Sequence, residues 1–229
     1  MTPQEISRLN ATFATADPTE IIRWAVETFR PDVAMTSAFG AESAALLHLA
    51  IQVDPTISVR MVDTGFLFPE TLQFVEELTR RFRLNVSVFK TKMDVEQFKR
   101  EHAHLPPGHP DYCCGDYKVE ATERALAGLR CWITGIRRDQ AATRAATPFV
   151  EVLSNGLTKV APLAAWSRKR IHDYMTTHQL PYHPLWSQGY TSIGCWPCTQ
   201  KPADPNDPRS GRWAGQDRTE CGIHDIGRD

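Results

Sequence analysis

Residues 32–51 read DVAMTSAFGAESAALLHLAI, and this stretch decides the fold class. Asp32 to Phe39 is a short apolar run of the kind that forms a buried strand, and Glu42 to Ile51 follows it with the apolar spacing of a helix. The same order of elements recurs further along the chain. A repeated strand-then-helix pattern predicts an α/β fold with a parallel sheet whose two faces are covered by helices.

The recurring elements lie on both sides of this opening unit. An amphipathic helix is expected before it, over Thr19 to Phe29. Those expected after it are the strand Ile57 to Val62, the helix Pro69 to Phe82, the strand Val86 to Phe89, the helix Asp94 to His102, the helix Lys118 to Leu126, the strand Cys131 to Gly135 and the helix Arg168 to His178, which Ser167 caps. From Pro181 onward, proline, glycine and tryptophan dominate, which is typical of a segment that wraps the core or moves over it.

The length of 229 residues allows one sizeable core. We therefore expect a single domain over residues 1–229, with an α/β core at about 30–180 and a C-terminal segment at about 181–229. A net charge of −1 gives no support for binding nucleic acid through bulk electrostatics. The most apolar stretch, Ala44 to Ile51, is far too short to span a membrane, and Met1 to Ala11 lacks the features of a signal peptide. The cytoplasm is the expected compartment.

Five of the six cysteines fall into a pattern that separates a structural role from a reactive one. Cys113 and Cys114 are adjacent, Cys195 and Cys198 are two residues apart, and Cys221 stands alone near the C-terminus. Two pairs of thiolates from distant segments suit one metal centre, while a separate fifth thiol suits chemistry. Because adjacent side chains diverge, the Cys113–Cys114 pair would reach a single ion only with strain, so a [4Fe-4S] cluster fits better.

Two other interpretations of the cysteines stay open. One is a tetrahedral zinc site, and the other is a pair of disulfides or free thiols. Cys131 is expected to be a buried apolar residue in a strand and no ligand. Cys221 lies in Glu220-Cys221-Gly222-Ile223-His224, where His224 favours the thiolate and Glu220 opposes it. Basic neighbours brought in by the fold or the substrate are therefore needed.

Ligands bind beyond the carboxyl ends of strands in a parallel sheet, so the loops that follow the strands are candidate sites. The loop Ser37 to Ser43, which includes Gly40, lets backbone N–H groups approach a phosphate or sulfate, although an ordinary strand-to-helix turn is an equal alternative. The stretch Asp63-Thr64-Gly65 offers a carboxylate to a ribose or base, or a cap for its own turn.

Arginines form the third candidate. Arg137 and Arg138 leave a buried strand directly after Gly135, where they would be costly without anionic partners, and guanidinium groups match phosphate and sulfate. Arg209 and Arg212 form a second basic cluster, which taken by itself could be ordinary solvated charge.

Together these motifs resemble the assimilatory sulfonucleotide reductases, specifically the iron-sulfur adenylylsulfate (APS) reductases related to phosphoadenylylsulfate (PAPS) reductase. The resemblance extends from about Ser37 to His224. The combination of Cys-Cys, Cys-x-x-Cys and Glu-Cys-Gly-Ile-His is its most specific part, and the loop Ser-Ala-Phe-Gly-Ala-Glu is similar to the modified pyrophosphate loop of the family.

The resemblance implies an adenine-nucleotide α-hydrolase-like fold with a mobile C-terminal tail. It implies that a [4Fe-4S] cluster binds to Cys113, Cys114, Cys195 and Cys198. The cluster-adjacent lysine of the family corresponds to Lys118, and its catalytic cysteine corresponds to Cys221. Its substrate-contacting arginines correspond to Arg137, Arg138, Arg209 and Arg212. Tyr117 stands where relatives usually have a basic residue, so the charge balance beside the cluster is expected to differ.

The implied activity is thioredoxin-dependent reduction of APS to sulfite and AMP, in assimilatory sulfate reduction. Cys221 would attack the sulfate sulfur and form an S-sulfocysteine, from which a thioredoxin thiol then releases sulfite. PAPS is the rival substrate; cluster-bearing members of the family mostly prefer APS. An ATP-cleaving enzyme of the same fold would need a fuller Ser-Gly-Gly-x-Asp-Ser loop. A non-catalytic metal-binding redox sensor would have no use for Cys221.

Overall fold

The computed structural model describes residues 1–104, 116–204, 207–214, 220 and 226. Within these residues six strands form one sheet in the order β3-β2-β1-β4-β6-β5. The strands are β1 Val33–Thr36, β2 Ser58–Asp63, β3 Asn85–Lys90, β4 Cys131–Ile133, β5 Val150–Val152 and β6 Thr158–Val160. All pairings are parallel except that of β5 with β6.

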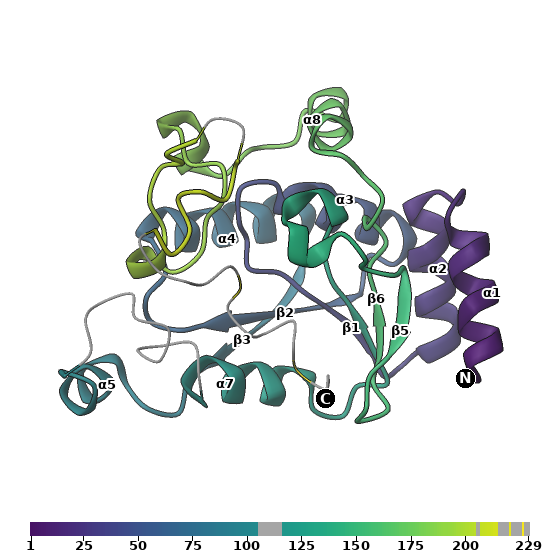
Figure 1. Ribbon diagram of the computed structural model, residues 1–229, viewed down its shortest axis with the longest axis horizontal. Helices are drawn as coiled ribbons and strands as arrows, with labels where there is room; N and C mark the ends of the chain where they lie inside the picture. The colour runs from purple at the N-terminus through teal and green to yellow at the C-terminus, as the bar shows by residue number, and fades with distance from the viewer. Residues whose placement is uncertain (105–115, 205–206, 215–219, 221–225, 227–229) are drawn as a thin grey trace.

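Helices cover both faces of this sheet, as Figure 1 shows for α3 and α4 on one side and α7 on the other. The α-helices are α1 Pro3–Phe13, α2 Pro18–Phe29, α3 Ser43–Val53, α4 Pro69–Phe82, α5 Val95–Glu101, α7 Asp116–Leu126 and α8 Arg168–Thr177. Short 3₁₀ helices are η1 Arg138–Gln140, η2 Ala142–Arg144, η3 Pro184–Gln188 and η4 Trp196–Cys198. No helix in the described part of the chain is long and apolar enough to cross a membrane.

The predicted α/β class and parallel sheet are confirmed. The helix over Pro69–Phe82 has its predicted bounds, and the side chain of Ser167 caps α8 by accepting a hydrogen bond from the N–H of Arg170. The sequence did not predict α1, β5 or β6. β5 also departs from the parallel pattern because a tight turn at Gly156, with φ of +83°, folds the chain straight back into a hairpin.

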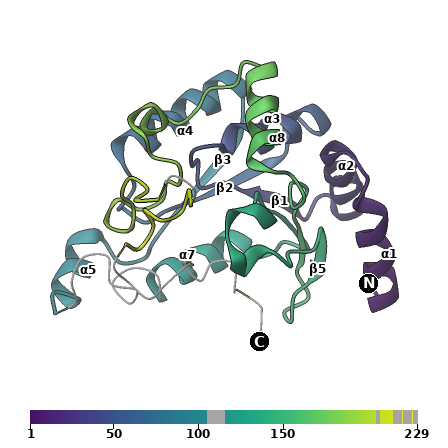
Figure 2. The same ribbon diagram turned by 45° about the horizontal axis from the view of Figure 1, so that its top comes forward.

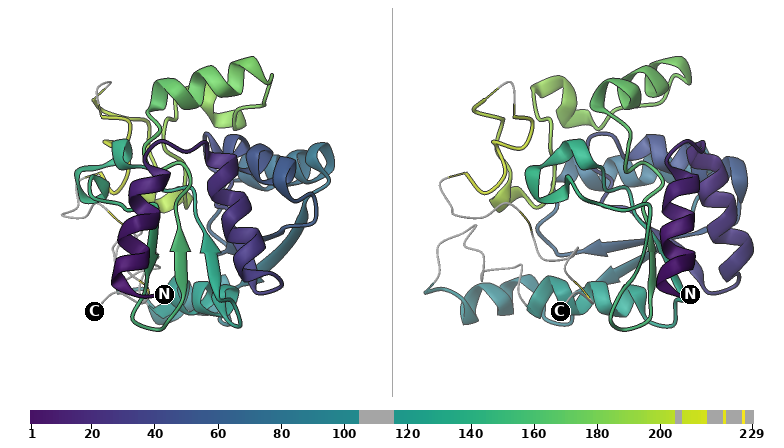
Figure 3. Two further views of the ribbon diagram at one scale, coloured as in Figure 1. Left: turned by 90° about the vertical axis from the view of Figure 1, so that its right-hand side faces the viewer. Right: turned by 45° about the vertical axis from the view of Figure 1, so that its right-hand side comes forward.

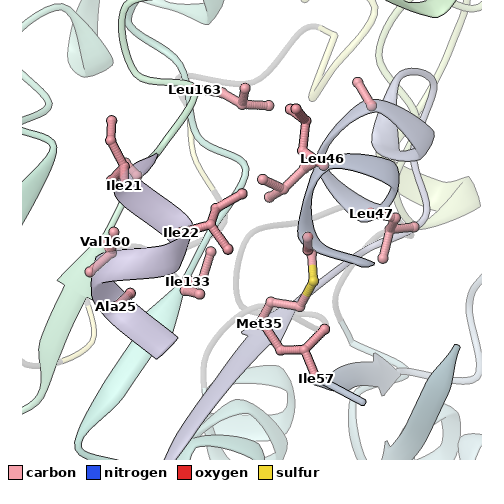
Figure 4. Close-up of a cluster of buried hydrophobic side chains, with 14 of the residues drawn as sticks. Ile21, Ile22, Ala25, Met35, Leu46, Leu47, Ile57, Ile133, Val160 and Leu163 are labelled. Atoms are coloured by element: carbon pink, nitrogen blue, oxygen red, sulfur yellow. The ribbon is translucent and has the colours of Figure 1, made fainter. Parts of the chain in front are cut away.

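The main core lies between the sheet and the layer of α2, α3 and α4 (Figure 4). Alternation along β4 decides which side chains enter it. Cys131 and Ile133 point into this core, while Trp132 between them belongs to a smaller cluster on the opposite face. Each face of the sheet is thus covered by its own apolar cluster.

The C-terminal part of the chain returns to the carboxyl ends of the strands. In Figure 2 the residues after α8 lie beside α4 and approach the end of β2. The N–H of Trp196 donates to the carbonyl of Phe66 at 2.8 Å, and His183 Nε2 lies 2.9 Å from the hydroxyl of Thr71 on α4. These contacts carry the Cys195–Cys198 turn to the edge where ligands of a parallel sheet bind.

Candidate functional site

The candidate site lies where the order of the strands in the sheet reverses. From β1 the chain builds β2 and β3 on one side, whereas β4, β6 and β5 lie on the other. The loops after β1 and β4 therefore diverge and leave a crevice, as expected where strand order reverses. A cavity of about 240 Å³ opens there. Seven predicted substrate-binding residues line it: Ser37, Gly40, Lys118, Gly135, Arg137, Arg209 and Arg212.

The loop after β1 forms one wall of this cavity. Phe39 is fully buried and adopts the left-handed conformation, with φ of 47°, and its N–H donates to Ser37 Oγ at 3.1 Å. A Cβ on Gly40 would lie 3.2 Å from the carbonyl oxygen of Ile193, so this position favours glycine. α3 then begins at Ser43 with no side-chain cap from Glu42. The N–H groups of Ser43 and Ala45 donate to the carbonyls of Gly40 and Glu42, both at 3.2 Å.

The two adjacent arginines after β4 have different environments. Arg137 is 5% exposed and lines the cavity, where its guanidinium donates to Glu42 at 2.9 Å and to Asp139 at 3.0 Å. Arg138 is absent from the described lining of the cavity. Its Nε donates to the carbonyl of Thr147 at 2.7 Å, and its guanidinium stacks on Phe149. The sequence treated the pair as one anion site; the structure brings only Arg137 to the cavity.

Glu220, the residue before Cys221, reaches the cavity through a two-point ion pair. Arg144 donates from Nε to Oε1 and from Nη2 to Oε2 of Glu220, both at 2.6 Å. Arg209 adds a contact at 3.3 Å. Burial by itself favours the protonated form of Glu220, but the hydrogen bonds and charges of Arg144 and Arg209 lower its pKa below the ordinary value. The acidic neighbour of Cys221 is therefore electrostatically compensated.

Arg212 joins the cavity to the Cys195–Cys198 turn. Its Nε donates to the carbonyl of Cys198 at 3.0 Å. A Cβ on Gly194 would lie 2.5 Å from a terminal nitrogen of Arg212, so the guanidinium rests directly on the glycine backbone. Arg212 also lines the cavity. One side chain thus contacts both the cavity and the segment that carries two predicted metal ligands.

The Cys195–Cys198 turn fits the role of half a cluster site. Both cysteines are 4% exposed and pack with Phe66, Phe98 and Trp213 in an apolar cluster. The indole N–H of Trp213 is buried without an acceptor in the described residues. A sulfur atom of a cluster bound to these two thiols would accept a hydrogen bond from this buried N–H group.

Four of the predicted site residues lie outside the described residues: the vicinal pair Cys113 and Cys114, and Cys221 and His224 in the tail. Within the described part of the chain, no three histidine, cysteine or acidic side chains come together as a metal site. The described residues therefore contain only Cys195 and Cys198 of the four predicted ligands.

Asp63, Thr64 and Gly65 lie beside the cysteine turn and are not among the described residues that line the cavity. Asp63 Oδ1 accepts a hydrogen bond from the N–H of Gly65 at 2.8 Å, so the carboxylate caps its own turn. The buried hydroxyl of Thr64 lies 3.2 Å from Cys195 Sγ. This loop supports the cysteine turn.

Cys131 is buried in β4, as predicted, with no exposed surface. Burial raises the pKa of its thiol to about 12, which keeps it protonated and unsuited to metal ligation.

The sequence missed several cavity residues: Glu42, Gln140, Arg144, Thr191, Ser192 and Glu220. Arg144 follows the predicted arginine loop closely and Glu220 precedes the predicted nucleophile. Both residues thus lie next to motifs that the sequence does indicate. Their pairing joins positions 76 residues apart, however, and is visible only in the tertiary structure.

This arrangement defines an α/β protein of the pyrophosphate-loop type. Residues 32–201 match the phosphoadenosine phosphosulfate reductase domain. An adenosine 5'-phosphosulfate reductase of Mesorhizobium japonicum is 43% identical over 94% of this chain and 85% of its own length. A phosphoadenosine 5'-phosphosulfate reductase of Gloeobacter violaceus is 42% identical over 90% and 88%. The chain belongs to the phosphoadenosine phosphosulfate reductase family, as its motifs predicted.

Solved structures agree with this assignment. A PAPS reductase from Candida auris, in a phosphate complex, has a TM-score of 0.74 and 32% identity, covering 86% of this chain and 96% of that one. An FMN adenylyltransferase from Candida glabrata has a TM-score of 0.57 at 13% identity, covering 86% and 73%. The second likeness concerns the fold alone.

Proposed function

We propose that this protein reduces APS to sulfite and AMP in sulfate assimilation, with Cys221 as nucleophile and thioredoxin as reductant. The observation that carries the proposal is the cavity between the β1 and β4 loops, which Lys118, Arg209 and Arg212 line together with Glu220, the residue before Cys221. Glu220 directly precedes the proposed nucleophile in the sequence. Four APS reductases that each match 90% or more of this chain support the same activity.

The proposed chemistry has two steps. The Cys221 thiolate attacks the sulfate sulfur, the bond from sulfur to the bridging oxygen breaks, and AMP leaves with the electron pair. A thioredoxin thiolate then attacks Cys221 Sγ, sulfite departs, and the second thioredoxin thiol resolves the mixed disulfide. Two electrons pass from the dithiol to sulfur. Lys118, Arg209 and Arg212 would neutralise the phosphosulfate, which otherwise repels a thiolate; His224 would favour the thiolate form of Cys221.

Ser37, Gly40 and Gly135 would hold the nucleotide through close backbone approach. Asp63 and Gly65 are proposed to act through the turn that presents Thr64 to Cys195. Arg138 would shape the loop that carries Arg137. Asp63, Gly65 and Arg138, which the sequence predicted as substrate-binding residues, would thus act indirectly.

A [4Fe-4S] cluster on Cys113, Cys114, Cys195 and Cys198 is part of the proposal. When bound, it would supply a fixed anchor between the two cysteine segments and an anionic field beside the substrate. Cys195 and Cys198 contribute buried thiols, and the Trp213 indole is available as a donor to a sulfur atom. Thiol ligands and a thiol nucleophile need a reducing compartment, which supports the cytoplasm as location.

The charge of the cavity suits an anionic nucleotide. Five cationic side chains and two carboxylates line it, a net of three positive charges. The phosphosulfate group carries two negative charges, whereas the 3′-phosphate of PAPS would add about two more. The net charge of the site would be about +1 with APS and about −1 with PAPS, so its charge is matched to an anionic nucleotide.

The test compares sulfite release from APS and from PAPS with reduced thioredoxin, for the wild type and Cys221→Ser. We expect turnover with APS, at least tenfold less with PAPS, and none in the variant, because a hydroxyl is a far weaker nucleophile. Equal rates with both substrates would reject the substrate assignment. Substantial turnover by Cys221→Ser would reject the nucleophile.

A second arm omits thioredoxin. Mixing the wild type with APS should release about one AMP per active site and leave a sulfonate on Cys221, detectable by intact mass, without free sulfite. Reduced thioredoxin should then discharge sulfite in one step. Release of AMP and sulfite together in the first mix would contradict the covalent scheme.

A further inference from the structure

Glu220 is held more tightly than an ordinary surface carboxylate. Its side chain is 17% exposed, and both of its oxygens accept hydrogen bonds from Arg144 at 2.6 Å. The hydroxyl of Thr143 donates to Oε1 at 3.3 Å, and Arg209 Nη2 donates to Oε2 at 3.3 Å. Bidentate arginine–carboxylate pairs fix geometry as well as charge. The residue before Cys221 is therefore fixed to the loop after β4.

The arginine that receives Glu220 is itself preorganised. Arg144 is 8% exposed, its Nη1 donates to Gln140 Oε1, and its N–H donates to the carbonyl of Ala141 within the same loop. Arg209 approaches from the other side with its guanidinium stacked on Trp213. Glu220 thus binds between the loop after β4 and the segment that carries Arg209 and Trp213.

The next described residue of the tail is also anchored. Ile226 packs against a cluster formed by Leu126, Trp132, Leu153 and Leu157, which lies on the face of the sheet opposite the main core. Glu220 is therefore held through charge, and Ile226 through apolar packing.

We propose that Glu220 is a positioning residue for the reaction: its ion pair with Arg144 fixes the residue directly before Cys221 at the cavity, and Ile226 is a second anchor of the C-terminal segment. This inference rests on the proposed function only for its consequence in catalysis. The pair also removes an electrostatic conflict, since a lone carboxylate beside Cys221 would repel both a thiolate and an anionic substrate. Arg144 therefore makes Glu220 compatible with the chemistry of its neighbour.

Glu220→Gln tests the anchor because it keeps the shape and removes the charge. In a single turnover with APS and no thioredoxin, we expect the adduct on Cys221 to form about 10- to 100-fold more slowly, since a misplacement of about 1 Å can cost 100-fold. AMP affinity should not fall, because removing a negative charge from the cavity does not weaken anion binding. A role in substrate binding would instead lower AMP affinity. Glu76→Gln, at an exposed position on α4, is the matched control and should behave as the wild type.

Exchanging the charges of Arg144 and Glu220 tests the same ion pair. Arg144→Glu should slow adduct formation at least as much as Glu220→Gln, and the double variant Glu220→Arg with Arg144→Glu should recover at least tenfold of that loss. If Arg144→Glu does not fold, recovery of the fold in the double variant is the corresponding result. No recovery in either measure would overturn the pairing.

Hydrogen–deuterium exchange gives a measurement that needs no substrate. Backbone amides of residues 219–226 should exchange faster in Glu220→Gln and in Ile226→Asp than in the wild type, while α4 and α8 stay unchanged. Wild-type exchange together with a wild-type adduct rate in Glu220→Gln would refute the inference. If the wild type forms no adduct with APS, the proposed function fails, and the exchange measurement still decides whether the anchor exists.

Discussion

Neighbouring residues of the same type serve different purposes in this protein. Arg137 is buried at the cavity against Glu42, whereas Arg138 packs on Phe149 away from it. Consecutive side chains in an extended segment point in opposite directions, so a pair of adjacent arginines rarely forms a single site. The same rule separates Cys131 from Trp132 in β4. At this scale, the direction of a side chain decides its role.

His183 gives a residue-level prediction of pH dependence. Burial lowers its pKa to about 4, only partly opposed by the charge of Glu70. The unfolded chain, with an ordinary histidine pKa near 6.5, binds the proton first as pH falls, so stability is complete above about pH 6.5 and declines toward pH 4. The loss attributable to His183 is on the order of 3 kcal/mol. Urea unfolding of the wild type and His183→Gln at several pH values measures it.

The variant should be less stable at pH 7 because it loses the contact with Thr71, yet its stability should depend less on pH between 6.5 and 4. His172→Gln, at an exposed position, is the control and should keep the wild-type slope. An unchanged slope in His183→Gln would assign the pH dependence elsewhere.

Hydrogen bonds from one side chain join α1 and β5, two elements that the sequence did not predict. α1 lies along the β5 edge of the sheet in Figure 3. Asn10 of this helix accepts hydrogen bonds from the N–H groups of Phe149 and Val150 at 2.8 and 3.1 Å, and donates to the carbonyl of Val150 at 2.8 Å. One amide side chain therefore satisfies the backbone of an edge strand that has no further strand beside it.

Asn10→Ala should destabilise the protein by about 1–3 kcal/mol, because it leaves part of the β5 backbone without its partners. Thermal or urea unfolding measures the change. The matched control is Asn85→Ala, whose side chain makes one long bond of 3.4 Å to the carbonyl of Thr56 and should cost less. Equal losses in the two variants would show that Asn10 has no special role at this edge.

At the scale of the whole molecule, the fold concentrates charge that the composition conceals. The chain carries a net charge of −1, yet five cationic side chains line one cavity. They come from α7, the loop after β4 and the C-terminal segment, and they converge only because strand order reverses between β1 and β4. A nearly neutral protein can thus bind a doubly charged ligand.

The proposed cluster would join segments that are far apart in the chain, so its ligands can be tested as a unit. Cys195→Ser or Cys198→Ser should lose iron and the visible absorbance, since serine is a poor ligand for iron-sulfur clusters. Cys131→Ala is the control: its thiol is buried and protonated, and the variant should keep the cluster. Iron analysis and absorbance spectra provide the measurements. Four irons retained in either serine variant would contradict the ligand assignment.

The sequence alone determined the α/β class, most helices and strands, and the family, because apolar periodicity and cysteine spacing are local patterns. It also indicated Ser37, Gly40, Gly135, Arg137, Arg209 and Arg212, all of which line the cavity. Only the tertiary structure decided the antiparallel β5, the different environments of Arg137 and Arg138, and the pairing of Arg144 with Glu220. These depend on contacts between distant segments, whose energies come from burial and charge that no local pattern encodes.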